Sequence, residues 1–410
     1  NTRTGFVLKS AVVVCFAMLL LLNNTQAQVI SNSGATINLT GGVVVQTDTV
    51  ANNGLITNNG VFNLNGDYRN AATTEGNGTI NLAGSWLNTG TFNAGNSTVQ
   101  FNGTNLQTIT KAGGEEFYKL VINNTGFAAN NRIMLSQQIT ISDTLTLMQG
   151  IIDPGVHTVF LTNSAISALN YTSTNGSRII GKFQRGVNST GTYLFPVGTL
   201  ANYNPLNLTN NTLAATGTIL SEFVSADPGD LGLPLTDLTS DDSVEVYQTY
   251  DDGYWNLVLT TFSVTDFDIN IDGAGFATAV QDITKVLKRN TGNDWTLDGT
   301  HKDAIGTVGF RNHLDSDLSP TGSQFALALG RPKIWTHPKD TAVCDGFSAS
   351  FSVYATGRKP LTYQWQVSIN NGVTWSNVNN GGIYSGATSS KLQLSATNLA
   401  MDGYLYRVIV

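Results

Sequence analysis

The chain carries little charge, and this excludes several classes of protein. Lysine, arginine, aspartate and glutamate make up 12% of its 410 residues, about half of the usual share in globular proteins. The formal net charge is −7. Nucleic-acid binding needs basic patches that neutralise phosphates, so we expect no nucleic-acid partner. Amphipathic helices are also lacking, because no stretch after Ala27 repeats apolar residues with the helical period.

Residues that carry catalysis are equally scarce. The chain has four histidines, which share no metal-ligand spacing, and no serine stands in a nucleophile elbow. The acids of the N-terminal part are too scattered to act as a carboxylate pair. One weak catalytic alternative lies in a single predicted domain: His301, Asp303, His313 and Asp315. Histidines in polar loops are the ordinary case, so we expect no enzymatic activity.

The N-terminus reads as a secretory signal peptide covering residues 1–27. Arg3 and Lys9 precede an apolar run, residues 11–22, that is shorter than the roughly 20 residues needed to cross a bilayer. Small residues end the segment at Ala27, where we expect cleavage. A buried core helix is the alternative, but nothing helical follows for it to pack against. We therefore expect a secreted protein, extracellular or at the cell surface, without a transmembrane span.

A repeat then organises residues 28–178. Each copy is an apolar, a polar and an apolar residue, followed after one residue by glycine: 36–41, 61–66, 79–84 and 98–103. The step from Phe62 to Ile80 is 18 residues and from Ile80 to Val99 is 19, whereas Ile37 to Phe62 is 25, which predicts an insertion. Such a period predicts a parallel β-solenoid. An antiparallel meander with Asn-Gly hairpins is the alternative.

The solenoid predicts which residues are buried and how the corners are made. The apolar pairs should point inward and stack in register, with Asn63 and Asn81 outward. Glycine with φ > 0 should permit each corner, and asparagines should supply left-handed geometry or side-chain hydrogen bonds there. The predicted inward residues are Ile37, Leu39, Phe62, Leu64, Ile80, Leu82, Val99 and Phe101.

Residues 179–330 predict an antiparallel β-sandwich. Longer strands appear here, and Pro196 and Pro205 mark edges or corners. The segment 227–273 holds eleven acidic residues and no lysine or arginine. Within it, alternation places Asp266, Asp268 and Asp272 on one strand face.

Residues 331–410 predict an immunoglobulin-like sandwich. Trp365 follows the alternating strand 349–355, and Asp402 precedes Tyr406 by four residues, as in a tyrosine corner. Val353 and Val408 then take the places where antibody domains have bridging cysteines. In this interpretation the domain is incomplete at its C-terminus.

Together these segments resemble secreted, multidomain, adhesin-like surface proteins of the Bacteroidota type. The resemblance rests on the phrases 195–199, 203–205, 362–368 and 371–375 and on the Asn-rich repeat. It implies cell adhesion, with extracellular glycans or surface proteins as partners, and type IX secretion. It also implies O-glycans on Asp followed by Ser or Thr, which fits Thr49, Thr144, Ser243 and Thr341.

Two functions remain open. The first is a non-catalytic structural or adhesive protein in which a solenoid stalk presents sandwich modules. The second is a carbohydrate-binding accessory region of a larger secreted polysaccharide-active enzyme.

Three local hypotheses accompany these functions. The acidic strand face predicts a structural calcium site, against the alternative of a solvated face, from Asp251, Asp252, Asp266, Asp268 and Asp272. The aromatic cluster Tyr247, Tyr250, Tyr254 and Trp255 predicts a sugar-stacking platform centred on Tyr254 and Trp255, against the alternative of core packing. Cys344 is the only cysteine outside the predicted signal peptide, and exported proteins rarely keep a lone thiol. We therefore expect a disulfide to a partner beyond Val410, against the alternative of a free, buried cysteine.

Overall fold

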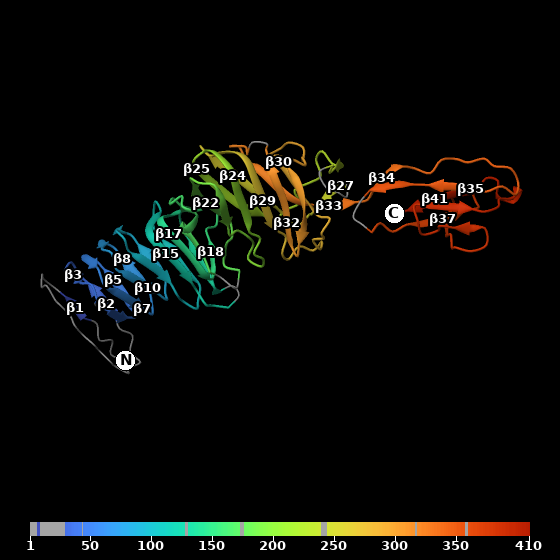
Figure 1. Cartoon of the computed structure of the whole chain (residues 1–410). Helices are drawn as coiled ribbons and strands as arrows, with labels where there is room; N and C mark the ends of the chain where they lie inside the picture. Colours follow the sequence, from blue (N-terminus) through green and yellow to red (C-terminus); the bar gives the residue numbers. More distant parts are fainter. Residues whose placement is uncertain are drawn as a thin grey trace.

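The computed structural model describes residues 6–8, 29–42, 44–127, 130–172, 176–238, 244–315, 318–356 and 360–410. An N-terminal solenoid, a central sandwich and a C-terminal module follow one another along an elongated molecule (Figure 1). Almost all regular structure is β-strand, apart from the short 3-10 turns η2 (Ile166–Ala168) and η3 (Leu399–Met401). Within the described residues, no helix is long and apolar enough to cross a membrane.

Three parallel sheets form the solenoid, which confirms the predicted fold and contradicts the antiparallel meander. The first sheet comprises β1 (Phe6–Leu8), β2 (Val29–Asn32), β5 (Thr49–Asn52), β8 (Tyr68–Asn70), β11 (Trp86–Asn88), β14 (Gln107–Thr110), β16 (Arg132–Leu135), β18 (Ile151–Asp153) and β21 (Arg178–Ile179). The solenoid part of the second, longest sheet comprises β4 (Val44–Thr47), β7 (Val61–Leu64), β10 (Thr79–Leu82), β13 (Thr98–Phe101), β15 (Glu115–Asn123), β17 (Ile139–Gln149) and β19 (Thr158–Leu161), with β20 (Leu169–Tyr171) beside β17. The third sheet comprises β3 (Thr36–Leu39), β6 (Leu55–Asn58), β9 (Thr73–Glu75) and β12 (Thr91–Asn93).

The apolar pairs of β7, β10 and β13 stack in register as predicted. Ile80 pairs with Phe62 on one side and Val99 on the other. Leu64, Leu82 and Phe101 form the neighbouring column, and all six side chains are buried. Asn63 and Asn81 point to the opposite face, where the Asn81 Nδ2 donates to Asn63 Oδ1 at 2.7 Å.

The prediction assigned the first copy of the repeat, residues 36–41, to the wrong sheet of the solenoid. Ile37 and Leu39 belong to β3, which pairs with β6 in the third sheet. The strand that pairs with β7 is β4, where Val45 faces Phe62 from 17 residues upstream. No insertion is needed, because each coil has several short strands and similar apolar pairs occur on more than one of them. Leu39 is buried, but Ile37 is only half-buried at this end of the solenoid.

The corner glycines differ from the prediction. Gly66 and Gly84 do not adopt positive φ. They are required by close stacking, because a Cβ on Gly66 would lie 2.4 Å from the Asp48 carbonyl oxygen and one on Gly84 2.3 Å from the Gly66 carbonyl carbon. Among the described residues the one asparagine with positive φ is Asn371, outside the solenoid.

For the asparagines, the second predicted alternative is confirmed, because their side chains supply hydrogen bonds at the corners. Their Oδ1 atoms accept corner N–H groups two residues ahead, as from Gly54 to Asn52 at 3.0 Å and from Gly90 to Asn88 at 3.1 Å. Nδ2 atoms donate to the Oδ1 of the next coil at 2.9, 2.7 and 3.0 Å. This buried asparagine column contains Asn32, Asn52, Asn70 and Asn88.

A buried carboxylate terminates the asparagine column. Glu115 Oε2 accepts from Asn88 Nδ2 and from Trp86 Nε1, both at 2.7 Å. Burial raises the pKa of the Glu115 carboxyl, although these two hydrogen bonds oppose the shift. Trp86 also stacks on Tyr68, with ring centroids 4.4 Å apart.

The long sheet continues without interruption into the central sandwich, the predicted architecture of this part. β22 (Lys182–Val187) pairs in parallel with β19 and antiparallel with β25 (Gly217–Val224). Beyond β25 the long sheet contains β28 (Tyr254–Thr260), β33 (Ser323–Arg331), β27 (Glu245–Thr249) and β26 (Leu235–Thr236), with β30 (Lys285–Asn290) beside β33. The opposing sheet contains β23 (Gly191–Phe195), β24 (Leu206–Ala215), β29 (Ser263–Asp272), β32 (Val308–Leu314) and β31 (Thr300–Ile305). One apolar core extends from Leu39 in the solenoid to Leu327 in the sandwich.

The C-terminal module has its own core around Trp365, whose side chain is fully buried. Its antiparallel strands are β34 (Lys333–Thr336), β35 (Ala349–Ser352), β36 (Tyr354–Thr356), β37 (Gln364–Ser368), β38 (Ser376–Asn377), β39 (Tyr384–Ser385), β40 (Lys391–Leu394) and β41 (Leu405–Ile409). The Tyr406 hydroxyl contacts the Tyr384 hydroxyl at 3.0 Å. A tyrosine corner bonds instead to backbone a few residues upstream, so that detail of the prediction is wrong within the described part of the module.

Two predictions fall largely or wholly outside the described residues. Of the predicted signal peptide, only Phe6–Leu8 is described, as strand β1 parallel to β2. The proposed glycosylation residue Ser243 is not described.

Candidate metal centre on the central sandwich

The acidic strand face predicted from the sequence is β29. Phe267, Ile269 and Ile271 point into the sandwich core and are fully buried. Asp266 and Asp268 alternate with them and project from the outer face, half-buried. The two-residue period of the strand therefore explains why these carboxylates lie side by side.

A β-bulge brings His313 to the two carboxylates. β29 and β32 pair at Phe267 with Leu314 and at Ile269 with Arg311, so two residues of β32 face Asp268 alone. His313 adopts φ +51° there. Bulges redirect side chains in this way, and the sequence offers no spacing that predicts this one.

The bulge creates a compact group of donor atoms. The His313 ring Nδ1 lies 3.2 Å from Asp266 Oδ1, and the His313 backbone N–H donates to Asp268 Oδ1 at 2.8 Å. Asn211 on β24 donates from Nδ2 to both carboxylates, at 3.1 and 3.0 Å. One ligand atom each from Asp266, Asp268 and His313 lie within 4.8 Å of one another.

Only two of the five predicted calcium ligands join this group. Asp272 lies at the end of β29, where its Oδ1 accepts from the Ala274 N–H at 2.9 Å. Asp252 lies in the turn before β28 and accepts from the Ala277 N–H at 2.7 Å, and Asp251 is exposed beside it. Residues six apart on a strand are separated by about 20 Å, so a single ion cannot bind Asp266 and Asp272 together.

The donor atoms of this group favour a transition-metal ion over calcium. Calcium takes six to eight oxygen ligands, whereas two carboxylates and an imidazole suit ions such as Zn²⁺. Without an ion, His313 and Asp266 form a surface contact of small energetic value.

The structure separates the residues of the weak catalytic alternative. The side chain of His301 exposes only 3% of its surface, and its Nε2 lies 3.3 Å from Asp303 Oδ1. Burial together with the nearby Lys285 lowers the pKa of His301 to about 4. The exposed His313 contacts Asp266. Asp315 instead shares a hydrogen bond with Asp298, which raises the pKa of the Asp315 carboxyl.

His301 belongs to a buried ionic group that packs the two sheets together. Arg311 Nη1 donates to Asp237 Oδ2 at 2.6 Å, and Lys285 Nζ lies 3.9 Å from the same oxygen. The Arg311 guanidinium also donates to the carbonyls of Leu297, Asp298 and Gly299. These contacts satisfy a buried cation, which is the structural role expected of arginine inside a protein.

The predicted sugar-stacking platform is wrong. Trp255 is fully buried, and its Nε1 donates to the Asn204 carbonyl at 2.8 Å. Tyr250 is also buried, and its hydroxyl contacts the Ala279 carbonyl and Thr284. Tyr254 is half-buried against a small core cluster around Trp295. Strand alternation on β28 points Trp255 inward, so the core-packing alternative is correct.

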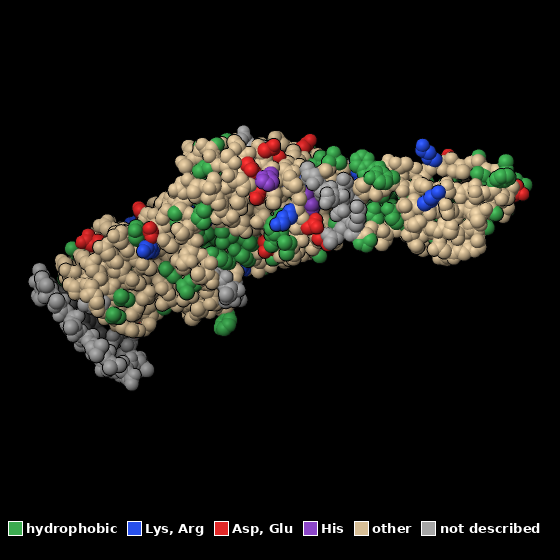
Figure 2. Space-filling view, viewed as in Figure 1, with side chains coloured by type: hydrophobic (Ala, Val, Ile, Leu, Met, Phe, Trp, Pro, Cys, Tyr) green, Lys and Arg blue, Asp and Glu red, His purple; other side chains and the backbone are tan. Residues whose placement is uncertain are grey.

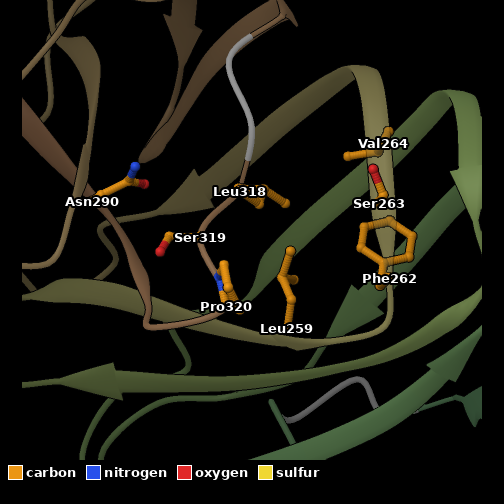
Figure 3. Close-up of a pocket in the computed structure, with 8 residues that line it drawn as sticks. All are labelled: Leu259, Phe262, Ser263, Val264, Asn290, Leu318, Ser319 and Pro320. Carbon is orange, nitrogen blue, oxygen red and sulfur yellow. The ribbon is translucent and has the colours of Figure 1, made fainter.

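A pocket of about 320 Å³ opens at one end of the sandwich (Figure 3). Its lining is apolar or neutral: Leu259, Phe262, Ser263, Val264, Asn290, Leu318, Ser319 and Pro320. A second pocket of about 510 Å³ lies beside Arg289 and Asp294. The first pocket lacks an acid, base or nucleophile pair among the residues that line it, so its geometry offers no general acid–base chemistry.

The remaining predicted residues lie on the surface or close to it. Cys344 is exposed and forms no disulfide within the described chain. Thr341 is exposed, whereas Thr49 and Thr144 are half-buried on β5 and β17.

No protein-family model matches the chain, and neither a curated protein nor a solved structure matches it.

Proposed function

We propose that the chain is a non-catalytic, secreted surface protein of structural or adhesive type, in which the solenoid is a stalk that presents the sandwich and an immunoglobulin-like module. The observation that carries this proposal is the long sheet, which runs from β4 through β22 to β26. Solenoid and sandwich share one sheet and one core, so strand pairing between β19 and β22 joins them directly.

The connection between the sandwich and the C-terminal module is short, and side-chain contacts stabilise it. Only Pro332 separates β33 from β34. Arg331 pairs with Glu245 at 2.6 Å, and Lys333 Nζ donates to Thr236 Oγ1 at 2.6 Å. The Lys333 contact holds the start of the module against the sandwich, and the Arg331–Glu245 pair fixes the end of β33 to β27 just before the joint. This supports a rod that keeps its last module at a fixed distance from its base.

The surface supports an extracellular role. On the face shown in Figure 2, charged side chains are few and scattered, in line with the 12% share of charged residues in the chain. Such a surface stays hydrated without attracting nucleic acid. The resemblance to adhesin-like proteins of the Bacteroidota type adds the expectation of surface attachment.

Orientation-controlled adhesion tests this function. Beads carrying the whole chain through its N-terminus should adhere to glycan-coated or matrix-protein-coated surfaces, and beads carrying it through its C-terminus should adhere less. Equal adhesion in both orientations would contradict the stalk, and release of soluble sugar from a polysaccharide panel would contradict the non-catalytic assignment.

A further inference from the structure

Trp335 is the most exposed tryptophan of the protein. Four of the six tryptophans are fully buried, namely Trp86, Trp255, Trp295 and Trp365, and Trp375 is half-buried. Trp335 exposes 47% of its surface and Tyr354, on the neighbouring strand, exposes 61%. Burial of large aromatic rings is the rule, so an exposed pair points to a role at the surface.

Both rings project from the outer face of the ribbon formed by β34 and β36. Ile334 pairs with Ala355, and both pack toward the core of the module. A register shift then places Trp335 and Thr336 opposite Tyr354. Figure 2 shows hydrophobic side chains gathered where β34 begins the C-terminal module.

The Trp335 ring is held in place before any ligand arrives. Its Nε1 donates to Thr356 Oγ1 at 2.8 Å. The Lys333 ammonium lies 4.6 Å from the centre of the Trp335 ring and also donates to Thr236 on the sandwich. A fixed ring loses little conformational entropy on binding, which favours affinity for a rigid, flat ligand.

The chemistry of this face indicates a neutral ligand. β34 and β36 contain no acidic residue, and the one cation, Lys333, is committed to Trp335 and Thr236. Two rings separated by threonines offer far less area than the roughly 800 Å² per partner of a stable protein interface. A sugar ring with equatorial substituents has a flat face of C–H groups that stacks on an aromatic ring, and its hydroxyls can bond to threonine.

We propose that Trp335 and Tyr354 form a binding platform for neutral polysaccharides whose pyranose rings present flat faces, such as β-linked glucans or chitin. This inference rests on the proposed adhesive function and names its ligand class. Thr336, exposed beside the rings, supplies a hydroxyl for the ligand. The contact between Lys333 and Thr236 holds the platform at the boundary between sandwich and module.

The test uses the whole chain on insoluble cellulose, insoluble chitin and soluble β-glucans, with bead adhesion measured in parallel. Trp335→Ala should weaken binding by roughly tenfold, equivalent to about 1.4 kcal/mol, and Trp335→Phe should retain most of it. Tyr247→Ala is the matched control, because Tyr247 is also exposed and also lies under a cation, Arg331, at 4.9 Å. Unchanged circular dichroism and melting temperature show that each variant is folded.

Two results would overturn the platform. One is equal polysaccharide binding by the parent chain and the Trp335→Ala variant. The other is binding to phospholipid vesicles or immobilised proteins, but to no neutral polysaccharide. Adhesion that persists in the Trp335→Ala variant would remove the platform and leave the adhesive function standing, whereas loss of adhesion by the parent chain on every surface would remove the function itself.

Discussion

Removing one amide from the asparagine column tests what holds the solenoid together. Asn70 lies in the middle of the column and is buried. Its Oδ1 accepts from Asn52 Nδ2 at 2.7 Å, and its Nδ2 donates to Asn88 Oδ1 at 3.0 Å and to the Thr91 carbonyl at 2.9 Å. Asn70→Ala therefore breaks the column on both sides.

The expected cost follows from these contacts. Each lost column bond is worth roughly 0.5–1.5 kcal/mol net, and the small cavity left by the amide adds about 1 kcal/mol. Asn52 Nδ2 keeps the Thr73 carbonyl and Asn88 Oδ1 keeps the Gly90 N–H, so neither neighbour loses every partner. We expect Asn70→Ala to lower the free energy of unfolding by roughly 2–4 kcal/mol.

Asn63→Ala is the matched control, since Asn63 lies in the same coil and bonds to Asn81 on the outer face. That half-exposed bond should contribute about 0.5 kcal/mol. Urea unfolding followed by circular dichroism measures both variants. If the two variants lose equal stability, or if Asn70→Ala costs less than about 1 kcal/mol, the column does not stabilise the solenoid as argued.

Four further predictions follow from other residues. Burial raises the pKa of Glu115 above its ordinary value of 4.5. The stability that the Glu115 carboxyl contributes is therefore complete below about pH 4.5 and is lost as the pH rises through the folded-state pKa. Glu115→Gln should remove this pH dependence in urea unfolding between pH 4 and 8, and an unchanged dependence would contradict the argument. Leu82→Asp places a charge in a fully buried position and should cost roughly 4 kcal/mol or more, which a melting curve reveals. Calorimetric titration should detect Zn²⁺ binding that His313→Ala abolishes and should detect none for Ca²⁺; calcium heat that depends on Asp268 would reverse the assignment. Cys344 is exposed, so a maleimide should label it without denaturant in a chain of residues 28–410, which lacks Cys15. Labelling of natively secreted protein without reductant would exclude the predicted disulfide.

The parts of the fold that local periodicity determines could be predicted from the sequence. The 18-residue step from Phe62 to Ile80 is a direct count of one coil, and the structure pairs these two residues. Ile37 shows the limit of that argument. The residues around Ile37 match the repeat as well as those around Phe62 do. Each coil contributes strands to three sheets, however, and the local pattern does not say which sheet a strand joins.

The candidate site depended on features that the sequence does not show. Alternation placed Asp266 and Asp268 together correctly, but His313 joins them only through a bulge that depends on the pairing of two distant strands. Trp255 and Trp335 both lie on short β-strands, and neither sequence says which side of its sheet the ring takes. Only the direction of each side chain from its strand, inward for one and outward for the other, decides which can meet a ligand.

The pairing of β7 with β10 makes the coil a unit of length. Every residue of Thr79–Leu82 pairs with its counterpart 18 residues earlier, so one duplicated coil could join the stack in the same strand register. Each duplication would move the sandwich and the module beyond it outward by about 4.8 Å. The length of the stalk is therefore set by its number of coils. Adding or removing coils would change the reach of the protein in small steps and leave the sandwich and the module at its far end unaltered.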